Sequence, residues 1–486
     1  MGVSIPRGSA GMNTKMKKAL YVLVGVTAAA VLAVVIFVRT FDINSYKPRI
    51  EAAVSEATGM KVRINGKLKL AFFPHARVSI EDILIQNQNA DVASVEEVQV
   101  KIKLLPLVGR KILIQQVGLI APRFFITKDR RGHFNFETPE RKFPEKKLPP
   151  FAAGKIFVKK GQVFYVDKKT GGKSEANECD LEIKNLAVVG GESIYASSFE
   201  GDLSCKEVKA KGLKVSDVRV VMKARERKFE ANPVTLKIFG GDGRGSIMGV
   251  MSGESPEYTV DFTITKFRFE EVLGAFKKKK SIRGELNLNS HLAMKGKNAN
   301  EMKRTAEGEI SLRGQNLVHE SIDLDRVLEM YEKTQRVSLV DMGGFFIAGP
   351  LGVLLTKGYD FGSLYEASLG GKSTIQKLVS DWKLKKGVAE AKDVAFSTRQ
   401  NRVAMKGRLD FVNERLDDVT VAVVDEKGCV RFRQKIHGNF RDPRVEKVSI
   451  LRSMAKPMLD LFDKASELFK GEECAIFYSG SVKHPK

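Results

Sequence analysis

Two stretches of the chain carry residues of the kind that bind phosphate. Residues 171–174 and residues 370–373 both read Gly-Gly-Lys-Ser, as does the end of a Walker A motif. That motif also needs a glycine five positions before its second glycine, because its backbone must wrap around the phosphates. Asp167 and Glu366 occupy those positions. We therefore expect neither stretch to bind a nucleotide.

The remaining residue types that perform catalysis are scattered. The six histidines do not form a His-x-x-x-His pair or lie beside a cysteine at zinc spacing, and the chain has no Gly-x-Ser-x-Gly elbow. Acidic pairs such as Asp417–Asp418 are more typical of a solvated surface than of an acid–base pair. The sequence therefore predicts a protein that is not an enzyme and has no metal, no cofactor and no small-molecule substrate.

The four cysteines are too far apart in sequence for a compact metal motif. Outside the cytoplasm they could form two disulfides, Cys179–Cys205 and Cys429–Cys474. The alternative is four buried free thiols.

The charge balance points to an anionic partner. The chain has 486 residues and a formal net charge of +24, which suits either nucleic acid or the phosphates of a membrane surface. At this length the chain exceeds the usual single core of about 250–300 residues, so two or more domains or a repeat array are expected.

The N-terminal region decides between these partners. Residues 19–38 carry no charge and, as a helix of about 30 Å, are long enough to span a bilayer. Arg7, Lys15, Lys17 and Lys18 precede them, so the positive-inside rule places residues 1–18 in the cytoplasm. A cleaved signal peptide is the alternative, and translation could begin at Met12 instead of Met1. The bulk of the chain then lies outside the cytoplasm, where anionic lipid is a better partner than nucleic acid.

Beyond the anchor, apolar residues alternate with polar ones at a period of two, which is typical of half-buried strands. We expect an antiparallel, mostly β chain with short helices at residues 44–57, 269–280 and 321–333. A proline-rich linker at 137–152 separates an N-terminal unit, 39–136, from a middle β region, 153–300, and a C-terminal β region, 301–444. Residues 445–486 are expected to form an amphipathic helix and a terminal strand. From alternation alone, a closed sandwich whose apolar residues are all core is the favoured architecture.

Several motifs change that preference. The anchor is followed by Phe41-Asp-Ile-Asn-Ser-Tyr-Lys-Pro48, then by the run from Gly66 to Pro74, by Leu104-Leu-Pro-Leu-Val-Gly-Arg110 and by Asp129-Arg-Arg-Gly-His-Phe-Asn135. In this order and spacing they resemble the N-terminal region of the AsmA family. Residues 359–364 and 436–443 are similar to its C-terminal portion. Ile43 stands where the family often has proline, Phe136 where it often has tryptophan, and the chain is short for the family.

The resemblance implies an elongated, twisted antiparallel sheet curled into a U-shaped groove with an apolar concave face. It also implies an inner-membrane protein with one N-terminal membrane helix, whose periplasmic bulk binds phospholipid acyl chains and supports lipid transport to, or assembly of, the outer membrane. Envelope proteins are further expected partners. The residues expected to line the groove are Val62, Ile64, Leu68, Leu70, Phe72, Val98, Val100, Ile102, Leu104, Val260, Phe262, Ile264, Ile282, Leu286, Leu288, Val403, Met405, Leu409 and Phe411.

Three features leave alternatives open. Lys277, Lys278, Lys279 and Lys280 are candidate headgroup contacts, or else a solvated helix end. The apolar residues 337–355 are expected to form a buried hairpin or to touch a membrane. The whole chain could instead be an assembly factor for outer-membrane proteins, with a closed β-sandwich and no bound lipid.

Overall fold

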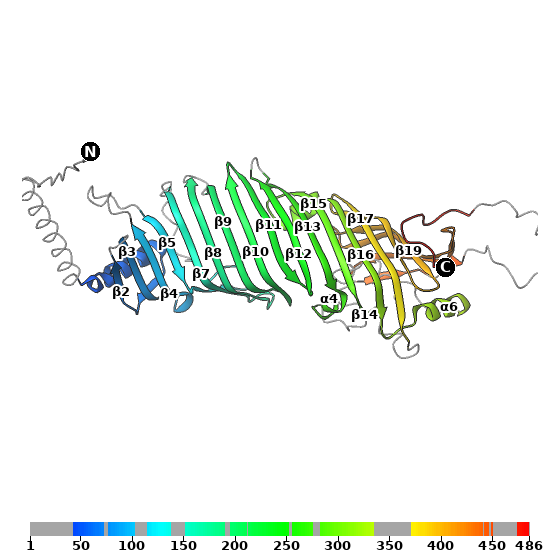
Figure 1. The fold of residues 1–486 in the computed structure, drawn as a ribbon, viewed down its shortest axis with the longest axis horizontal. Coiled ribbons are helices and arrows are strands. Elements are labelled where there is room, and N and C mark those ends of the chain that lie inside the picture. The colour runs from blue at the N-terminus through cyan, green and yellow to red at the C-terminus, as the bar shows by residue number, and fades with distance from the viewer. Residues whose placement is uncertain are drawn as a thin grey trace, which may run out of the picture.

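The computed structural model describes residues 42–71, 76–102, 114–137, 151–189, 195–210, 212–251, 255–275, 282–334, 371–440, 442–446, 449–450 and 474–485. Within them the protein is mostly β, with 23 strands joined in one large sheet and a few short helices. The strands lie side by side along the molecule, with the first strands at one end and the last strands at the other (Figure 1). The mostly β prediction is therefore confirmed.

The N-terminal half of the sheet contains strands β1 to β13. Their bounds are β1 Lys61–Ile64, β2 Leu68–Ala71, β3 Ala76–Asn87, β4 Ala90–Ile102, β5 Ile114–Ile120, β6 Arg123–Lys128, β7 Phe151–Asp167, β8 Lys173–Val189, β9 Tyr195–Ala210, β10 Leu213–Arg225, β11 Lys228–Ile238, β12 Gly241–Val250 and β13 Glu257–Arg268.

The C-terminal half contains the ten remaining strands. Their bounds are β14 Ile282–Arg283, β15 Glu285–Lys295, β16 Glu307–His319, β17 Ser373–Lys385, β18 Val388–Ser397, β19 Arg402–Asp410, β20 Arg415–Val424, β21 Val430–Asn439, β22 Asp442–Val445 and β23 Ser449–Ile450.

Most strands pair antiparallel with a neighbour in the chain, but β7 departs from the antiparallel prediction. It pairs parallel with β5 through residues 155–159 and with β6 through residues 162–167. Parallel neighbours need a crossover longer than a tight turn, and a long connection precedes β7. Phe151 already belongs to β7, so the predicted linker 137–152 ends too late; residues 138–150 lie outside the described part.

Short helices sit at the ends of strands. The helix expected at 44–57 is a 3₁₀ turn, η1 Ile43–Tyr46, followed by α2 Lys47–Thr58. Asp42 accepts a hydrogen bond from the Asn44 N–H at 3.0 Å, and Gly59 ends α2 at a φ of 71°. The other predicted helices are α4 Phe269–Ala275 and α6 Leu324–Thr334, whereas α5 Ala299–Thr305 was not predicted.

β-bulges shift the side-chain alternation within strands. Ile264 and Phe267 are three residues apart, yet both lie on the apolar side of the sheet. Lys266 between them has a φ of 52° and takes up the extra residue. Lys160, at a φ of 54°, marks a similar shift in β7. The bulges keep apolar residues on one side where strict alternation would turn them to the other.

Two compact cores lie at opposite ends of the sheet. A small one at the N-terminal end contains Val62, Ile64 and Leu68, with Ile43 and Ile50 packed against it. A much larger one, which we call the closed core, gathers buried residues of α4, α6 and β13 to β21. The sheet in this region curls, so that strands distant in sequence share one interior (Figure 1).

The C-terminal residues 474–485 cover the other side of β17 to β20. Tyr478 and Val482 pack there against Val379, Ala404 and Val424. Burial raises the pKa of the Tyr478 hydroxyl, as does the neighbouring Asp393 carboxylate that accepts its hydrogen bond at 2.6 Å. The strands of this region are therefore covered on both sides.

Several predicted features lie outside the described residues: the membrane helix 19–38, the apolar segment 337–355 and Lys277 to Lys280. None of the helices in the described ranges is long and apolar enough to cross a bilayer. The helix predicted from residue 445 is wrong at its start, because Val445 ends β22 and Ser449–Ile450 pair with β21 as β23. The domain boundaries stay a prediction.

Candidate functional site

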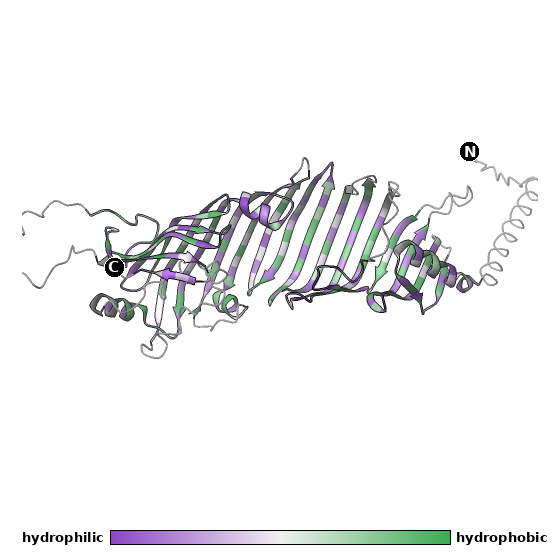
Figure 2. Ribbon diagram, turned by 180° about the vertical axis from the view of Figure 1, so that it is seen from behind, coloured by the Kyte–Doolittle hydropathy of each residue, from purple (hydrophilic) through white to green (hydrophobic). Residues whose placement is uncertain are grey.

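One side of the sheet carries apolar side chains in continuous rows that cross many strands. The first row passes from each residue to its paired neighbour and is apolar except for Ser290: Leu68, Ile80, Val98, Leu119, Val158, Leu181, Leu203, Val220, Val234, Gly245, Phe262, Ser290, Ile310 and Trp382. Bands of apolar and polar residues alternate along the strands in Figure 2.

A second row runs beside the first without a polar side chain. Its members are Leu70, Val78, Val100, Val117, Ile156, Ile183, Gly201, Met222, Ala231, Ile247, Val260, Leu292, Gly308, Leu384, Ala389, Leu409, Leu416 and Gly438. Paired residues on one side of a sheet have neighbouring side chains, so each row is a continuous apolar strip.

The burial of these rows changes along the molecule. Between β7 and β13, most of the row residues that carry a side chain are only half-buried, and Val220, Met222 and Ile247 are examples. Large exposed apolar areas on a soluble domain usually mark an interaction surface. We call the apolar side of β7 to β13 the open face.

Strand β12 contributes almost no side chains to the open face. Gly241, Gly243, Gly245 and Gly249 share the face with Ile247. A Cβ on Gly245 would lie 2.4 Å from the Phe262 ring. Because Gly245 has no side chain, the Phe262 ring can lie across β12. The ring then covers the backbone of β12 with an apolar surface.

The opposite side of the same strands is polar and carries ion pairs within strands and between them. Lys155 and Lys184 contact Glu182 at 2.7 and 2.9 Å, and their hydrogen bonds lower the pKa of Glu182 to about 2. Lys209 and Lys214 act in the same way on Glu207, whose pKa is also lowered to about 2. The two sides of this single sheet therefore differ sharply in polarity.

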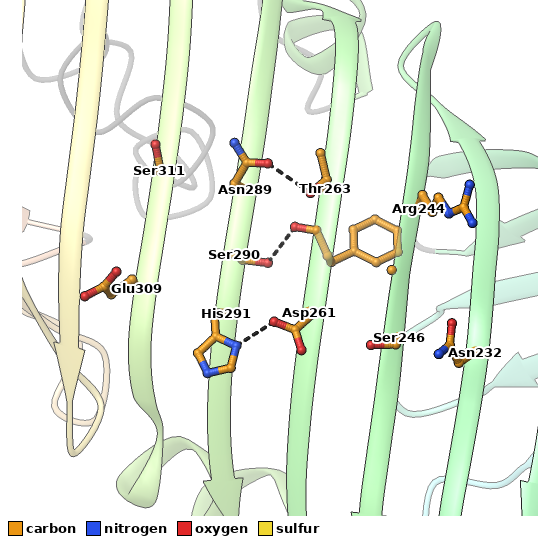
Figure 3. Close-up of a pocket in the computed structure, with 12 residues that line it drawn as sticks. Asn232, Arg244, Ser246, Asp261, Thr263, Asn289, Ser290, His291, Glu309 and Ser311 are labelled. Atoms are coloured by element: carbon orange, nitrogen blue, oxygen red, sulfur yellow. Dashed lines mark hydrogen bonds and ion pairs between the residues drawn. The ribbon is translucent and has the colours of Figure 1, made fainter.

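A pocket of about 480 Å³ lies among polar side chains of β11 to β16 (Figure 3). His291 contacts Asp261 at 2.5 Å, and the Thr263 hydroxyl is 2.9 Å from Asn289 (Figure 3). These groups are exposed and satisfy one another, so the pocket has no nucleophile held by a base. In the described part of the chain, no His, Cys, Asp or Glu residues gather in threes as metal ligands would.

The structure divides the predicted groove residues into three groups. Val62, Ile64 and Leu68 are buried in the N-terminal core, and Phe72 and Leu104 lie outside the described residues. Half-buried side chains in the apolar rows or beside them belong to Leu70, Val98, Val100, Ile102, Val260 and Phe262. Of these, Val98, Val100, Ile102 and Val260 have an apolar paired neighbour on each side. Whether these contact lipid stays a prediction.

The third group needs a correction. Ile282, Leu286, Val403, Met405 and Leu409 are between 0 and 4% exposed in the closed core. They fill an interior because the sheet curls and helices cover it. Ile264, Leu288 and Phe411 pack against the same core. We therefore leave these eight residues out of the candidate site.

Sequence reasoning named no candidate between Leu104 and Val260, although the open face lies mostly there. The bulges at Lys160 and Lys266 break the period of two, and glycine replaces a side chain at many positions of β12. A glycine followed by a charged and then an apolar residue, as in Gly201-Asp202-Leu203, was the available signal, and in the structure it lies inside β9.

Two disulfides join the pairs of cysteines expected from the sequence. Cys179 and Cys205 link β8 to β9 directly opposite each other. Cys429 and Cys474 link the C-terminal segment to the turn that precedes β21. Disulfides are typical of proteins outside the cytoplasm.

Comparisons with known proteins identify a family for the N-terminal part. Residues 16–202 match the model of the AsmA family. This range includes β1 to β8 and the start of β9, and thus part of both apolar rows. No curated protein and no solved structure matches the chain. The family match supports the resemblance found in the sequence motifs: residues 16–202 of the chain are similar to the AsmA family.

Proposed function

We propose that the protein binds the acyl chains of phospholipids on the open face and carries them between membranes of the cell envelope. The observation that supports this most strongly is the pair of apolar rows, which stay half-buried through β7 to β13. The similarity to the AsmA family and the large β-sheet fit a role in lipid transport or envelope assembly.

The energetics of acyl chains match such a surface. Moving an acyl chain from an apolar environment into water costs roughly 0.8 kcal/mol of free energy for each CH₂ group. The rows offer apolar contact from one strand to the next, so a chain that slides along them exchanges one apolar neighbour for another. The polar headgroup would stay in water at the edge of the sheet.

The proposed location is the periplasm, with the chain anchored in the inner membrane. Residues 19–38 are uncharged and follow basic residues, which supports a membrane helix with its N-terminus in the cytoplasm. The two disulfides fit an oxidising compartment.

The alternative function is an assembly factor that carries no lipid and has a closed β-sandwich. The closed core favours this alternative for residues 373–424, where both sides of the sheet are covered. The open face favours lipid binding, because a sandwich would bury Val220, Met222 and Ile247 as fully as Leu409.

A lipid-transfer assay separates the two functions. The full chain is reconstituted in donor vesicles that contain a fluorescent phospholipid, and transfer to acceptor vesicles is followed by the change in fluorescence. We expect the wild-type chain to accelerate transfer and Ile247→Asp to abolish the acceleration, because a carboxylate on the open face repels acyl chains.

Met248→Asp is the matched control, because Met248 is the next residue of β12 and faces the polar side, where it is 48% exposed. This variant should transfer lipid as the wild type does. Equal transfer with and without wild-type protein would reject the proposal and favour the assembly factor.

A further inference from the structure

Both apolar rows lead from the open face into the closed core. In the second row, Leu384, Ala389 and Leu409 are 7, 0 and 2% exposed. The first row ends at Trp382, which is 2% exposed and donates a hydrogen bond to the Ser380 hydroxyl at 2.8 Å. The strips that are half-buried over β7 to β13 are thus solidly covered at their C-terminal end.

Two helices contribute to this cover. Phe269, Val272 and Leu273 of α4 are no more than 1% exposed, and α4 directly follows the last strand of the open face. Val327 and Leu328 of α6 lie in the same core. Interiors of this kind are close-packed, so an acyl chain could enter only by displacing several side chains.

The N-terminal end of the sheet is also blocked. The outer edge of β1 and β2 donates its N–H groups to side chains of the first helices: Val62 to Ser55 at 3.0 Å, Ile64 to Glu51 at 2.6 Å and Leu68 to Asn44 at 2.9 Å. No further strand can pair along this edge without displacing those contacts. On the apolar side, the N-terminal core lies at this end of the sheet, with Val62, Ile64 and Leu68 no more than 7% exposed and Ile43 and Ile50 packed against them. The apolar rows therefore lead into a packed core at each end.

We propose that acyl chains enter and leave the open face across its long edges, where the strands turn, and never pass through the C-terminal region. This inference rests on the proposed function and deepens it. The protein then has a binding face of finite length that a membrane must approach from the side, and residues 282–440 act as a solid end to it.

Between β7 and β13, turns of the chain lie at both long edges of the sheet. Neither apolar row includes a residue of these turns. The turns at 168–172 and 239–240 lie on one edge, and the turn at 226–227 lies on the other. Phe239 packs against the closed core, whereas no core cluster includes residues of the turns at 168–172 and 226–227. A lipid that enters at these two turns needs no core to open.

The chain's own methionines can report the route. Photoactivatable methionine is incorporated throughout the full chain, which is then mixed with vesicles of phosphatidylethanolamine and phosphatidylglycerol and irradiated. Met222 lies on the open face, Met248 on the polar side and Met405 in the closed core at 4% exposure. We expect lipid adducts on Met222 and at least tenfold fewer on Met248 and Met405.

The outcomes separate the inference from the proposed function. Adducts on Met405 as frequent as on Met222 would overturn the inference and leave lipid binding in place. No adducts on Met222, or equal labelling of Met222 and Met248, would overturn the proposed function and the inference with it.

Trp382 gives a second, independent reading, since it is the only tryptophan of the chain. Phospholipid with brominated acyl chains quenches tryptophan on contact. Under conditions in which Met222 is labelled, we expect Trp382 fluorescence to change by less than a tenth. Strong quenching would mean that acyl chains reach the end of the first row.

Discussion

The open face and the closed core are built from the same alternation, yet they differ in what covers them. From residue 154 to 268, the only apolar side chains that are fully buried are those of Cys205, Ala231, Val234 and Phe267 among the described residues. From 282 to 440, the same side of the sheet carries Leu286, Leu378 and Val421 at no more than 1% exposure. A period of two therefore specifies which residues share a side, and not whether that side is covered.

The other side of the sheet differs between the two regions as well. Over β7 to β10 it carries ion pairs such as Lys159–Asp180 at 2.9 Å, which stay in water. Over β17 to β20 it carries Val379, Ala395 and Ala422 at 0% exposure under the C-terminal segment. One region is a single layer with a polar back, and the other is a solid body.

The largest expected effect is a charge in the closed core. Leu409→Asp buries a carboxylate at a site that is 2% exposed, and we expect it to cost more than about 5 kcal/mol and to unfold residues 282–440. Near-ultraviolet circular dichroism of Trp382 measures this loss. Leu203→Asp on the open face should keep the Trp382 signal. A folded Leu409→Asp would show that the core is not closed.

Some features of these two regions could be predicted from the sequence, and others could not. Asp42 and Gly59 as helix caps, and the apolar parity of Val260 to Ile264, follow from local chemistry and were predictable. The burial of Leu409 could not be predicted, because the residues that cover it belong to α4, α6 and strands distant in sequence. Local patterns do not contain contacts between remote segments. The parallel pairing of β7 escaped for the same reason.

The two disulfides should affect the two regions separately. Cys429→Ser/Cys474→Ser opens a link across 45 residues and should destabilise the closed region by about 2–4 kcal/mol. Hydrogen exchange of residues 474–485 should rise, while that of β8 and β9 stays unchanged. Cys179→Ser/Cys205→Ser should raise hydrogen exchange in β8 and β9 and leave that of residues 474–485 unchanged. Spread of either effect to both regions would mean that they unfold as one unit.

The smallest expected effect concerns the polar back of the open face. Lys155 and Lys184 lower the pKa of Glu182 to about 2, so its ionised form is favoured by folding. This contribution is complete above the ordinary glutamate pKa of 4.5 and disappears as the pH falls towards 2. Because the Glu182 side chain is 35% exposed, Glu182→Gln should cost less than about 1 kcal/mol at pH 7.

Thermal melts of the wild type and Glu182→Gln should converge as the pH is lowered from 5 to 2. A difference that grows towards low pH would have the wrong sign for this ion cluster. The carboxamide keeps the size of the side chain, so packing on the polar side is unaffected.

The most direct test of the open face uses two adjacent residues of β10. Val220 belongs to the first apolar row, and Val221 faces the other side, where it pairs with Asp202. Each is changed to aspartate in the full chain, and phospholipid bound per chain is counted by mass spectrometry after identical purification. Residues 19–38 are identical in all three proteins, so any lipid bound there contributes equally to the three counts. We expect Val220→Asp to lose most of the remaining lipid and Val221→Asp to keep it. Equal lipid counts in the two variants would contradict binding on the open face.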